Sequence, residues 1–242
     1  MLVGAATFPC AQGEPDKADR IAAEAEHTIE RACLHADAAA LAAEPNQPSL
    51  LYTRAFAFYA DGVLHHGPKD LAVREQCYDA AVNLLKRVKG APWEAEAAAL
   101  HGSILGELIS MRKNAIWAGA TLGPKSSRLL AQANKDAPLN PRVLMFRGRS
   151  LLFTPKMFGG DPVEGAALLQ RAVDRFAVGG ADTPGPHWGH ADALAWLGFA
   201  QRQSGDLAAA RAAWEQALAI EPDYAWVKRV LLPSLDQILS EK

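Results

Sequence analysis

The side chains best placed to do chemistry lie in His187-Trp-Gly-His190-Ala-Asp192, which brings two imidazoles and a carboxylate together in the chain. Such groups can bind zinc when neighbouring hydrogen bonds fix their orientation. The only comparable group is the pair His65-His66. One His-x-x-His at the start of a helix is a weak zinc pattern, so we expect His190 or Asp192 to cap the helix and Trp188 to pack. The sequence predicts no metal and no cofactor.

Patterns typical of enzymes are not found in the sequence. It contains no G-x-S-x-G, H-E-x-x-H, phosphate-binding P-loop or G-x-G-x-x-G. Carboxylates such as Glu24 and Glu30 share a helix face with Arg20 and Arg31, where ion pairing between turns and solvation explain them. We therefore expect a protein without catalytic activity.

Charge and composition narrow the class of partner. The 242 residues include 25 Lys and Arg against 27 Asp and Glu, a net charge of −2, so nucleic acid and anionic membrane surfaces are disfavoured. There is no apolar run of the roughly eighteen residues that a membrane-spanning helix needs. Alanine is abundant whereas aromatic residues make up only 7% of the chain, a balance that favours helices over strands. The prediction is an all-α protein.

The three cysteines, Cys10, Cys33 and Cys77, are widely spaced and form no C-x-x-C pattern. This spacing indicates neither a disulfide framework nor a zinc knuckle. Cys33 and Cys77 lie in alanine-rich helical stretches, where a buried thiol is the simpler interpretation. A disulfide between these two residues is the alternative in an oxidising compartment.

The first thirteen residues are small and apolar and give way to the charged segment that starts at Glu14. They look like the end of a secretory signal, with Ala11-Gln-Gly13 at the positions that a signal peptidase reads. No Lys or Arg precedes Lys17, so two interpretations stay open. Met1 is an internal start within a longer precursor, or residues 1–13 are an ordinary frayed terminus.

Apolar residues recur at steps of three and four along the rest of the chain, between turns that contain proline or glycine. The pattern predicts nine or ten helices in an antiparallel array of helix hairpins. Residues 14–139 form a degenerate helical-hairpin region, and residues 140–242 form the clearer repeats with a C-terminal capping helix. The expected helices are 16–44, one from Ser49 that Gly62–Gly67 and Pro68 break, 71–90, 93–113, a short one at Leu129–Ala133 capped by Gly123–Ser127, 141–153, 162–176, 190–204, 207–220, and 223–239 with a kink at Pro233.

A 34-residue unit between Ala191 and Tyr224 is the most specific pattern. The unit resembles a tetratricopeptide repeat, although Gln201 stands where that family usually has an aromatic residue. Gly198 and Ala210 are small where two helices would cross closely, and Asp206 can cap the second helix. The matching residues, at positions 4, 7, 8, 15, 20, 24, 27 and 32 of the unit, are Leu194, Leu197, Gly198, Gly205, Ala210, Trp214, Ala217 and Pro222.

A degenerate unit precedes this one, with Gly148 and Gly165 at the small positions of its two helices. The spacing between these glycines is five residues too long, so the loop Phe153–Pro162 must bulge from the hairpin. In one interpretation Met157 and Phe158 fold back onto the hairpin while Asp161 caps the next helix; in the other, the loop is a lip over a ligand groove.

The segment 140–232 as a whole looks like exported bacterial tetratricopeptide proteins of unassigned activity, and is similar to a periplasmic component that accompanies some TRAP transporters. The resemblance implies a periplasmic or exported protein; otherwise the protein is cytoplasmic. Gly102 and Ala133 fit a third unit with a long insert over Trp117–Pro124. Ala80 and Leu84 fit a fourth unit.

Stacked helix pairs curve, so the first helix of each pair lines a concave face. Guanidinium groups beside aromatic rings suit a peptide segment or its carboxylate. The predicted function is therefore a non-catalytic scaffold that binds a protein or peptide segment, of unidentified partner and oligomeric state. The expected binding residues are Phe146, Arg147, Arg149, Phe158, Asp192, Trp196, Gln201 and Arg202.

The alternative is a helical accessory protein of a periplasmic transport system that encloses a small apolar ligand under the Met157–Phe158 loop. An enclosed pocket between Phe146, Phe153, Phe158 and Trp196 would favour the ligand carrier. An open groove with exposed Arg147 and Gln201 would favour the peptide binder.

Overall fold

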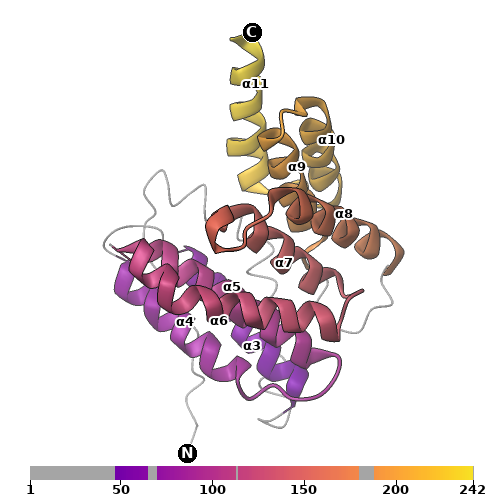
Figure 1. Cartoon of the computed structure of the whole chain (residues 1–242). Helices are drawn as coiled ribbons and strands as arrows, with labels where there is room; N and C mark the ends of the chain where they lie inside the picture. The colour runs from indigo at the N-terminus through magenta and orange to yellow at the C-terminus, as the bar shows by residue number, and fades with distance from the viewer. Residues whose placement is uncertain (1–46, 65–69, 113, 180–187, 242) are drawn as a thin grey trace, which may run out of the picture.

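Helices in consecutive antiparallel pairs build the protein (Figure 1). The computed structural model describes residues 47–64, 70–112, 114–179 and 188–241, and these contain nine α-helices and no strand. The predicted all-α array is confirmed, while residues 1–13 and the helix expected over 16–44 lie outside the described residues. The elements are α3 (Pro48–Leu64), α4 (Leu71–Leu85), α5 (Trp93–Met111), α6 (Ala115–Asp136), α7 (Pro141–Phe153), a 3-10 turn η1 (Lys156–Phe158), α8 (Pro162–Gly179), α9 (His190–Gln203), α10 (Leu207–Ile220), a π-helical turn η3 (Val227–Leu231) and α11 (Leu232–Ser240).

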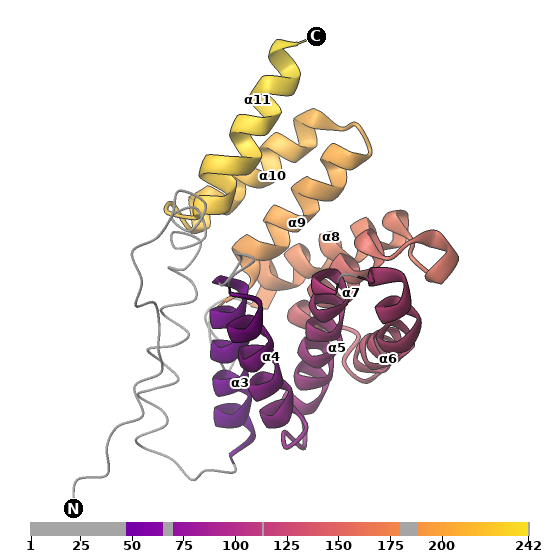
Figure 2. The same cartoon turned by 90° about the vertical axis from the view of Figure 1, so that its left-hand side faces the viewer.

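Four hairpins make up the array: α3 packs on α4, α5 on α6, α7 on α8, and α9 on α10. The second helix of each hairpin also packs on the first helix of the next, and α3, α5 and α7 contact one another in turn. The stack curves, so that α3 lies near the start of α9 (Figure 2). A continuous core runs from Leu51 in α3 to Leu235 in α11, and the regions predicted as 14–139 and 140–242 share it.

A buried glycine marks the helix crossing in each hairpin. A methyl group added to Gly102 would lie 2.8 Å from Leu130 Cγ, and one added to Gly148 would lie 2.8 Å from the carbonyl oxygen of Gly165. Gly62 meets the ring of Tyr78 in the same way. Gly198 meets the indole of Trp214. At each of these positions only the smallest side chain leaves room for the atoms of the neighbouring helix.

Gly62 corrects one expectation. The sequence pattern treats it as the start of a break, but it lies inside α3 and is buried. Glycine weakens a helix by about 1 kcal/mol relative to alanine, which is less than the packing gained when Tyr78, fully buried, fills the space above Gly62.

Helix α6 corrects a second expectation. The helix runs unbroken through Pro124, where an insert over Trp117–Pro124 and a cap at Gly123–Ser127 were expected. An interior proline costs about 3 kcal/mol because it removes a hydrogen bond and crowds the preceding turn. The fully buried Leu130 and the 2.6 Å hydrogen bond from Ser126 Oγ to the carbonyl oxygen of Gly102 hold the helix against α5 despite that cost.

Several local predictions are confirmed. Helices α7 and α10 have the predicted bounds. Asp161 Oδ1 accepts from the backbone N–H groups of Val163 and Glu164, both at 3.0 Å, and so caps α8. Asp206 Oδ1 caps α10 by accepting from the N–H of Ala209 at 3.0 Å. Near Pro233, where a kink was expected, the π-helical turn η3 ends at Leu231 and α11 begins at Leu232.

Among the described helices, none combines the length and the apolar character needed to cross a lipid bilayer.

Candidate ligand-binding surface

Four aromatic side chains meet where the third and fourth hairpins join the C-terminal helix. They are Phe153 at the end of α7, Trp196 and Phe199 on α9, and Trp226 directly before η3, and we call them the aromatic surface. The ring centroid of Trp196 lies 5.6 Å from Phe153, 5.9 Å from Phe199 and 4.6 Å from Trp226. Phe153 is 52% exposed and the other three are half-buried, so the cluster presents ring faces and edges to solvent.

Two arginines border the aromatic surface. The Arg149 guanidinium lies 5.4 Å from the Trp196 ring, and the Arg202 guanidinium lies 4.9 Å from the Phe199 ring. Arg202 also donates to Ser234 Oγ of α11 at 2.9 Å, which fixes its side chain against the C-terminal helix. Cationic groups held over ring faces are attracted by the ring quadrupole and leave charge at the edge of an apolar patch.

Arg149 is mostly buried and ties three hairpin helices together. Its guanidinium donates to Tyr59 Oη of α3 at 3.1 Å, to Ser103 Oγ of α5, and to Glu107 Oε1 of α5 at 3.2 Å. Glu107 in turn accepts from Arg74 of α4 at 3.4 Å. The expectation of Arg149 as a free ligand-binding group is therefore corrected, because its donors are engaged within the chain.

A titratable pair lies beneath the aromatic surface. Tyr224 donates from its hydroxyl to Asp192 Oδ1 at 2.7 Å, and its ring contacts Trp226 edge-on. Burial away from water raises the pKa of the Asp192 carboxyl to about 6, an effect that outweighs the opposing hydrogen bond from Tyr224. Asp192 thus supports Tyr224 from below instead of facing solvent.

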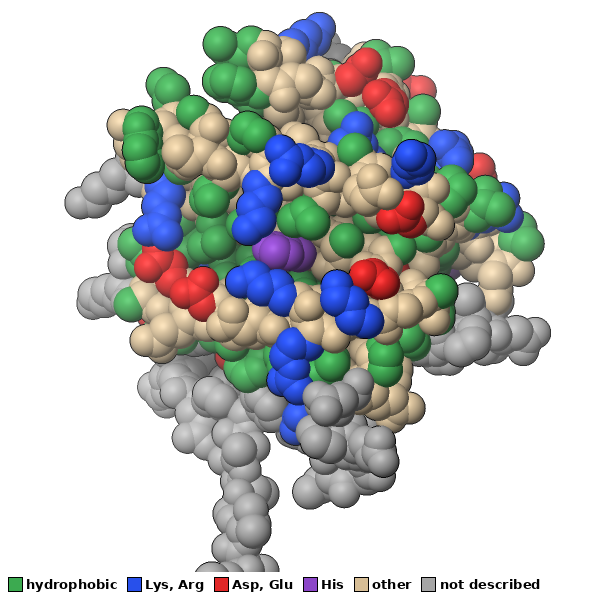
Figure 3. Space-filling view, turned by 60° about the horizontal axis from the view of Figure 1, so that its bottom comes forward, with side chains coloured by type: hydrophobic (Ala, Val, Ile, Leu, Met, Phe, Trp, Pro, Cys, Tyr) green, Lys and Arg blue, Asp and Glu red, His purple; other side chains and the backbone are tan. Residues whose placement is uncertain are grey.

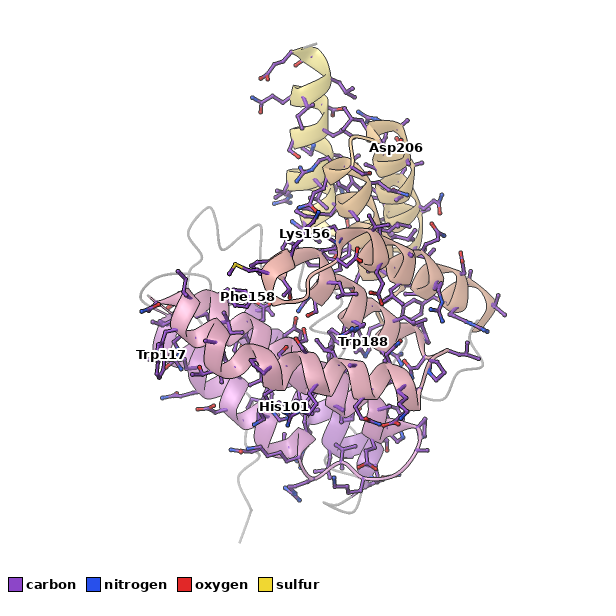
Figure 4. The ribbon with its side chains drawn as sticks, in the orientation of Figure 1. His101, Trp117, Lys156, Phe158, Trp188 and Asp206 are labelled. Atoms are coloured by element: carbon purple, nitrogen blue, oxygen red, sulfur yellow. The ribbon has the colours of Figure 1, made fainter. Side chains whose placement is uncertain are left out.

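The bulged loop between α7 and α8 projects from the hairpin (Figure 4). Met157 is 83% exposed and Phe158 is 48% exposed, so the interpretation in which both fold back onto the hairpin is wrong. Gly159 adopts a left-handed φ of 87°, and a methyl group on Gly160 would collide with the Thr154 carbonyl. The loop is a compact turn that holds two apolar side chains in solvent.

Phe146 is placed differently from the expected site. It is 2% exposed and packs against Tyr59 and Trp188, whose ring stacks on Phe56 at a centroid distance of 3.8 Å. Aromatic side chains of the chain itself therefore fill this part of the inner face. The Arg149 guanidinium lies within 6 Å of the rings of both Phe146 and Trp196.

Two further expected binding residues are not part of the aromatic surface. Arg147 and Gln201 are half-buried, and Gln201 Oε1 is buried without a hydrogen-bond partner among the described residues. The sequence reasoning missed Phe199 and Trp226 as parts of the site. Trp196 and Phe199 are three residues apart on one helix, and that spacing was a usable signal for a shared face.

In the part of the segment His187–Asp192 that the structure describes, the rings of Trp188 and His190 pack against other side chains. His190 stacks on Phe176 at 5.5 Å, Trp188 is buried, and α9 begins after Gly189 without a side-chain cap. Neither His190 nor Asp192 is therefore the expected cap. Within the described ranges, no group of three His, Cys, Asp or Glu is arranged to hold a metal ion. His187 and His65-His66 lie outside those ranges.

Cys77 is a free, buried thiol that donates to Asp61 Oδ2 at 3.4 Å. Burial, together with the neighbouring carboxylate, raises the pKa of the Cys77 thiol to about 12. The partner in the alternative disulfide, Cys33, lies outside the described residues.

No protein-family model matches the chain, and no curated protein matches it. Among solved structures, the chain is similar to the HusA haemophore from Porphyromonas gingivalis, with a TM-score of 0.56 and 23% sequence identity. The match covers 79% of this chain and 96% of that chain. At this level of identity the similarity shows a shared fold.

Proposed function

We propose that this protein is a non-catalytic binding protein of the tetratricopeptide type, which holds an apolar segment of a partner protein against the aromatic surface. The observation that carries the proposal is the connected set of rings around Trp196, with Phe153 half-exposed and the Arg202 guanidinium over Phe199. The 34-residue pattern between Ala191 and Tyr224 supports the family, and the exported location expected from that resemblance is part of the proposal.

Aromatic residues and arginine are the side chains that most often dominate the free energy of protein binding. A ring such as Phe153, packed against Trp196, loses little conformational entropy when a partner covers it. Met157 and Phe158 on the projecting loop add apolar area beyond the end of α7. An open surface of this shape suits an extended or helical segment with apolar side chains and a nearby acidic group for Arg202.

The test uses peptides selected from a random library displayed on phage, with binding of the synthetic peptides measured by fluorescence polarisation. Replacement F153A should weaken binding about tenfold or more, as expected for an aromatic hot spot. Ile220→Ala is the matched control, because Ile220 is 48% exposed on α10 and lies outside the aromatic surface. Equal affinity in the two variants would contradict the proposal.

A second candidate is a planar, aromatic small ligand of the haem class, and the fold shared with a haemophore favours it. The rings of the aromatic surface could stack on a macrocycle, and Arg202 could pair with a carboxylate. None of the four rings or two arginines is an iron ligand, so contacts to the macrocycle and its carboxylates would supply the affinity.

Titration with haemin tests this candidate. A saturable change in the Soret band at one haemin per chain, lost in Phe153→Ala and kept in Ile220→Ala, is the expected result. If the Soret band changes no more than it does when haemin is added to a non-binding protein, the haem candidate is wrong and the peptide proposal is unaffected.

A further inference from the structure

A furrow on the outer face of α5 is independent of the aromatic surface. Helix α5 packs against α4 on one side and α6 on the other. His101 of α5 lies here with 7% exposure. Figure 3 shows a histidine at the floor of a hollow that Lys and Arg side chains border on both sides, and Figure 4 labels His101 on the corresponding face of the molecule.

The His101 ring is incompletely satisfied. Its Nε2 atom is buried and has no hydrogen-bond partner among the described residues, whereas Nδ1 is not among the buried unpaired atoms. A buried N–H without an acceptor is rare in proteins because it costs free energy. The tautomer that carries its proton on Nδ1 places no N–H on the buried Nε2 atom. Its Nδ1–H is then the donor available at the furrow.

Two lysines border the ring from opposite helices. Lys86 directly follows α4 and Lys125 lies in α6; both are exposed, and neither forms an ion pair with a described residue. Burial and the charges of both lysines lower the pKa of His101 to about 4, so the imidazole is neutral at pH 7.

The charge around the furrow is locally basic in a chain with a net charge of −2. Arg128 lies one turn after Lys125 and is exposed. Figure 3 also shows Asp or Glu side chains beside the basic ones on one side of the hollow. Of the carboxylates on α5, Glu94 binds Lys89 and accepts from the N–H of Gly90.

We propose that this furrow binds a phosphate group, free or carried by a small monoester, between Lys86 and Lys125, with the His101 N–H donating a third hydrogen bond. Lysine ammonium groups act as point charges that attract a phosphate dianion. A neutral imidazole can donate an N–H hydrogen bond to the phosphate, whereas a carboxylate at the same place would repel it. Neither Lys86 nor Lys125 offers the bidentate guanidinium geometry that favours a carboxylate ligand.

The test follows the imidazole resonances of the full chain by ¹H–¹⁵N NMR at pH 7 and constant ionic strength. The probes are inorganic phosphate and glycerol 3-phosphate. A saturable shift of the His101 ring nitrogens with either probe supports the site, and the tighter of the two identifies free phosphate or a monoester as the preferred source. The remaining histidines serve as internal references.

Variants establish where the probe binds. The double replacement K86Q/K125Q should weaken binding at least about tenfold, because it removes both charge-assisted contacts. The control K156Q/K228Q makes the same change in charge on η1 and η3 and should leave the affinity unchanged. An unsaturated, linear shift with both probes, or equal affinity in the two double variants, would overturn the proposal. Both pairs are exposed, and circular dichroism checks that the helices persist.

Discussion

Trp214 donates from its indole Nε1 to the carbonyl oxygen of Ala195 at 3.0 Å, one turn before Gly198, over which the indole lies. Trp214 is fully buried, and the hydrogen bond satisfies its one polar atom. The contact fixes the crossing of α9 and α10 and sets the separation of their backbones.

The Gly198→Ala variant should be less stable than the natural protein by about 1–3 kcal/mol, because the added methyl group overlaps the indole. Urea unfolding measures the change. Gly106→Ala is the matched control on α5, where an added methyl group has nothing within 4 Å. That control should gain about 0.5–1 kcal/mol from helix propensity. If both variants were more stable than the natural protein, the Trp214 indole would have moved aside at little cost, which would contradict the prediction.

Glu96 and Arg142 form a buried ion pair between α5 and α7, with Arg142 Nη1 3.2 Å from Glu96 Oε1. Their side chains are only 6% and 9% exposed. Glu96→Gln should cost about 3–5 kcal/mol in the free energy of unfolding, because it removes the carboxylate that pairs with the buried Arg142 guanidinium. The exposed pair Lys89–Glu94 supplies the control: Glu94→Gln should change stability little. Similar losses in the two variants would contradict this interpretation.

Asp192 should make stability depend on pH. Its pKa is raised to about 6 by burial, so the protonated form is favoured in the folded state. The stabilisation that this group provides is complete below the unfolded pKa, about 4, and is lost as the pH rises through 6. Replacement D192N keeps an acceptor for Tyr224 without the charge. Urea unfolding at pH 4.5 and pH 8 should show D192N gaining stability relative to the natural protein at the higher pH. A pH-independent difference would refute the prediction.

Pro124 lies in the interior of α6 and is exposed. Pro124→Ala restores a backbone N–H for the preceding turn and should stabilise the protein by up to about 3 kcal/mol. The midpoint of thermal unfolding should therefore rise. An unchanged midpoint would mean that the helix has relaxed around the proline at little cost.

Local signals in the sequence predicted the elements whose ends are set by their own residues. Asn140 and Pro141 begin α7, with the Asn140 side chain accepting from the N–H groups of Arg142 and Val143, and Asp206 begins α10 in the same way. Their bounds were predictable because a cap acts within one turn. The small residues Gly148 and Gly198 were also predictable from repeat spacing.

The misplaced features depend on contacts with distant parts of the chain. From the sequence alone, Gly62 could either break a helix or permit a close helix crossing. The Tyr78 ring that packs over Gly62 decides for the crossing. Phe146 was assigned to a ligand groove because its helix face is the inner one, but Trp188 covers it from more than forty residues away. The aromatic surface could be found only in part, since Trp226 joins Trp196 from beyond the repeat.

The contacts between the first hairpin and the later ones have a consequence for how the molecule comes apart. In an open stack of helix pairs, each pair touches only its neighbours and the ends fray independently. Here Phe56 of α3 stacks on Trp188 just before α9, and Tyr59 of α3 accepts from Arg149 of α7. Peeling away the first pair therefore also uncovers the third and the start of the fourth. Amide hydrogens in α3 should therefore exchange with solvent at the same rate as those in α7, because the two helices open in one cooperative step.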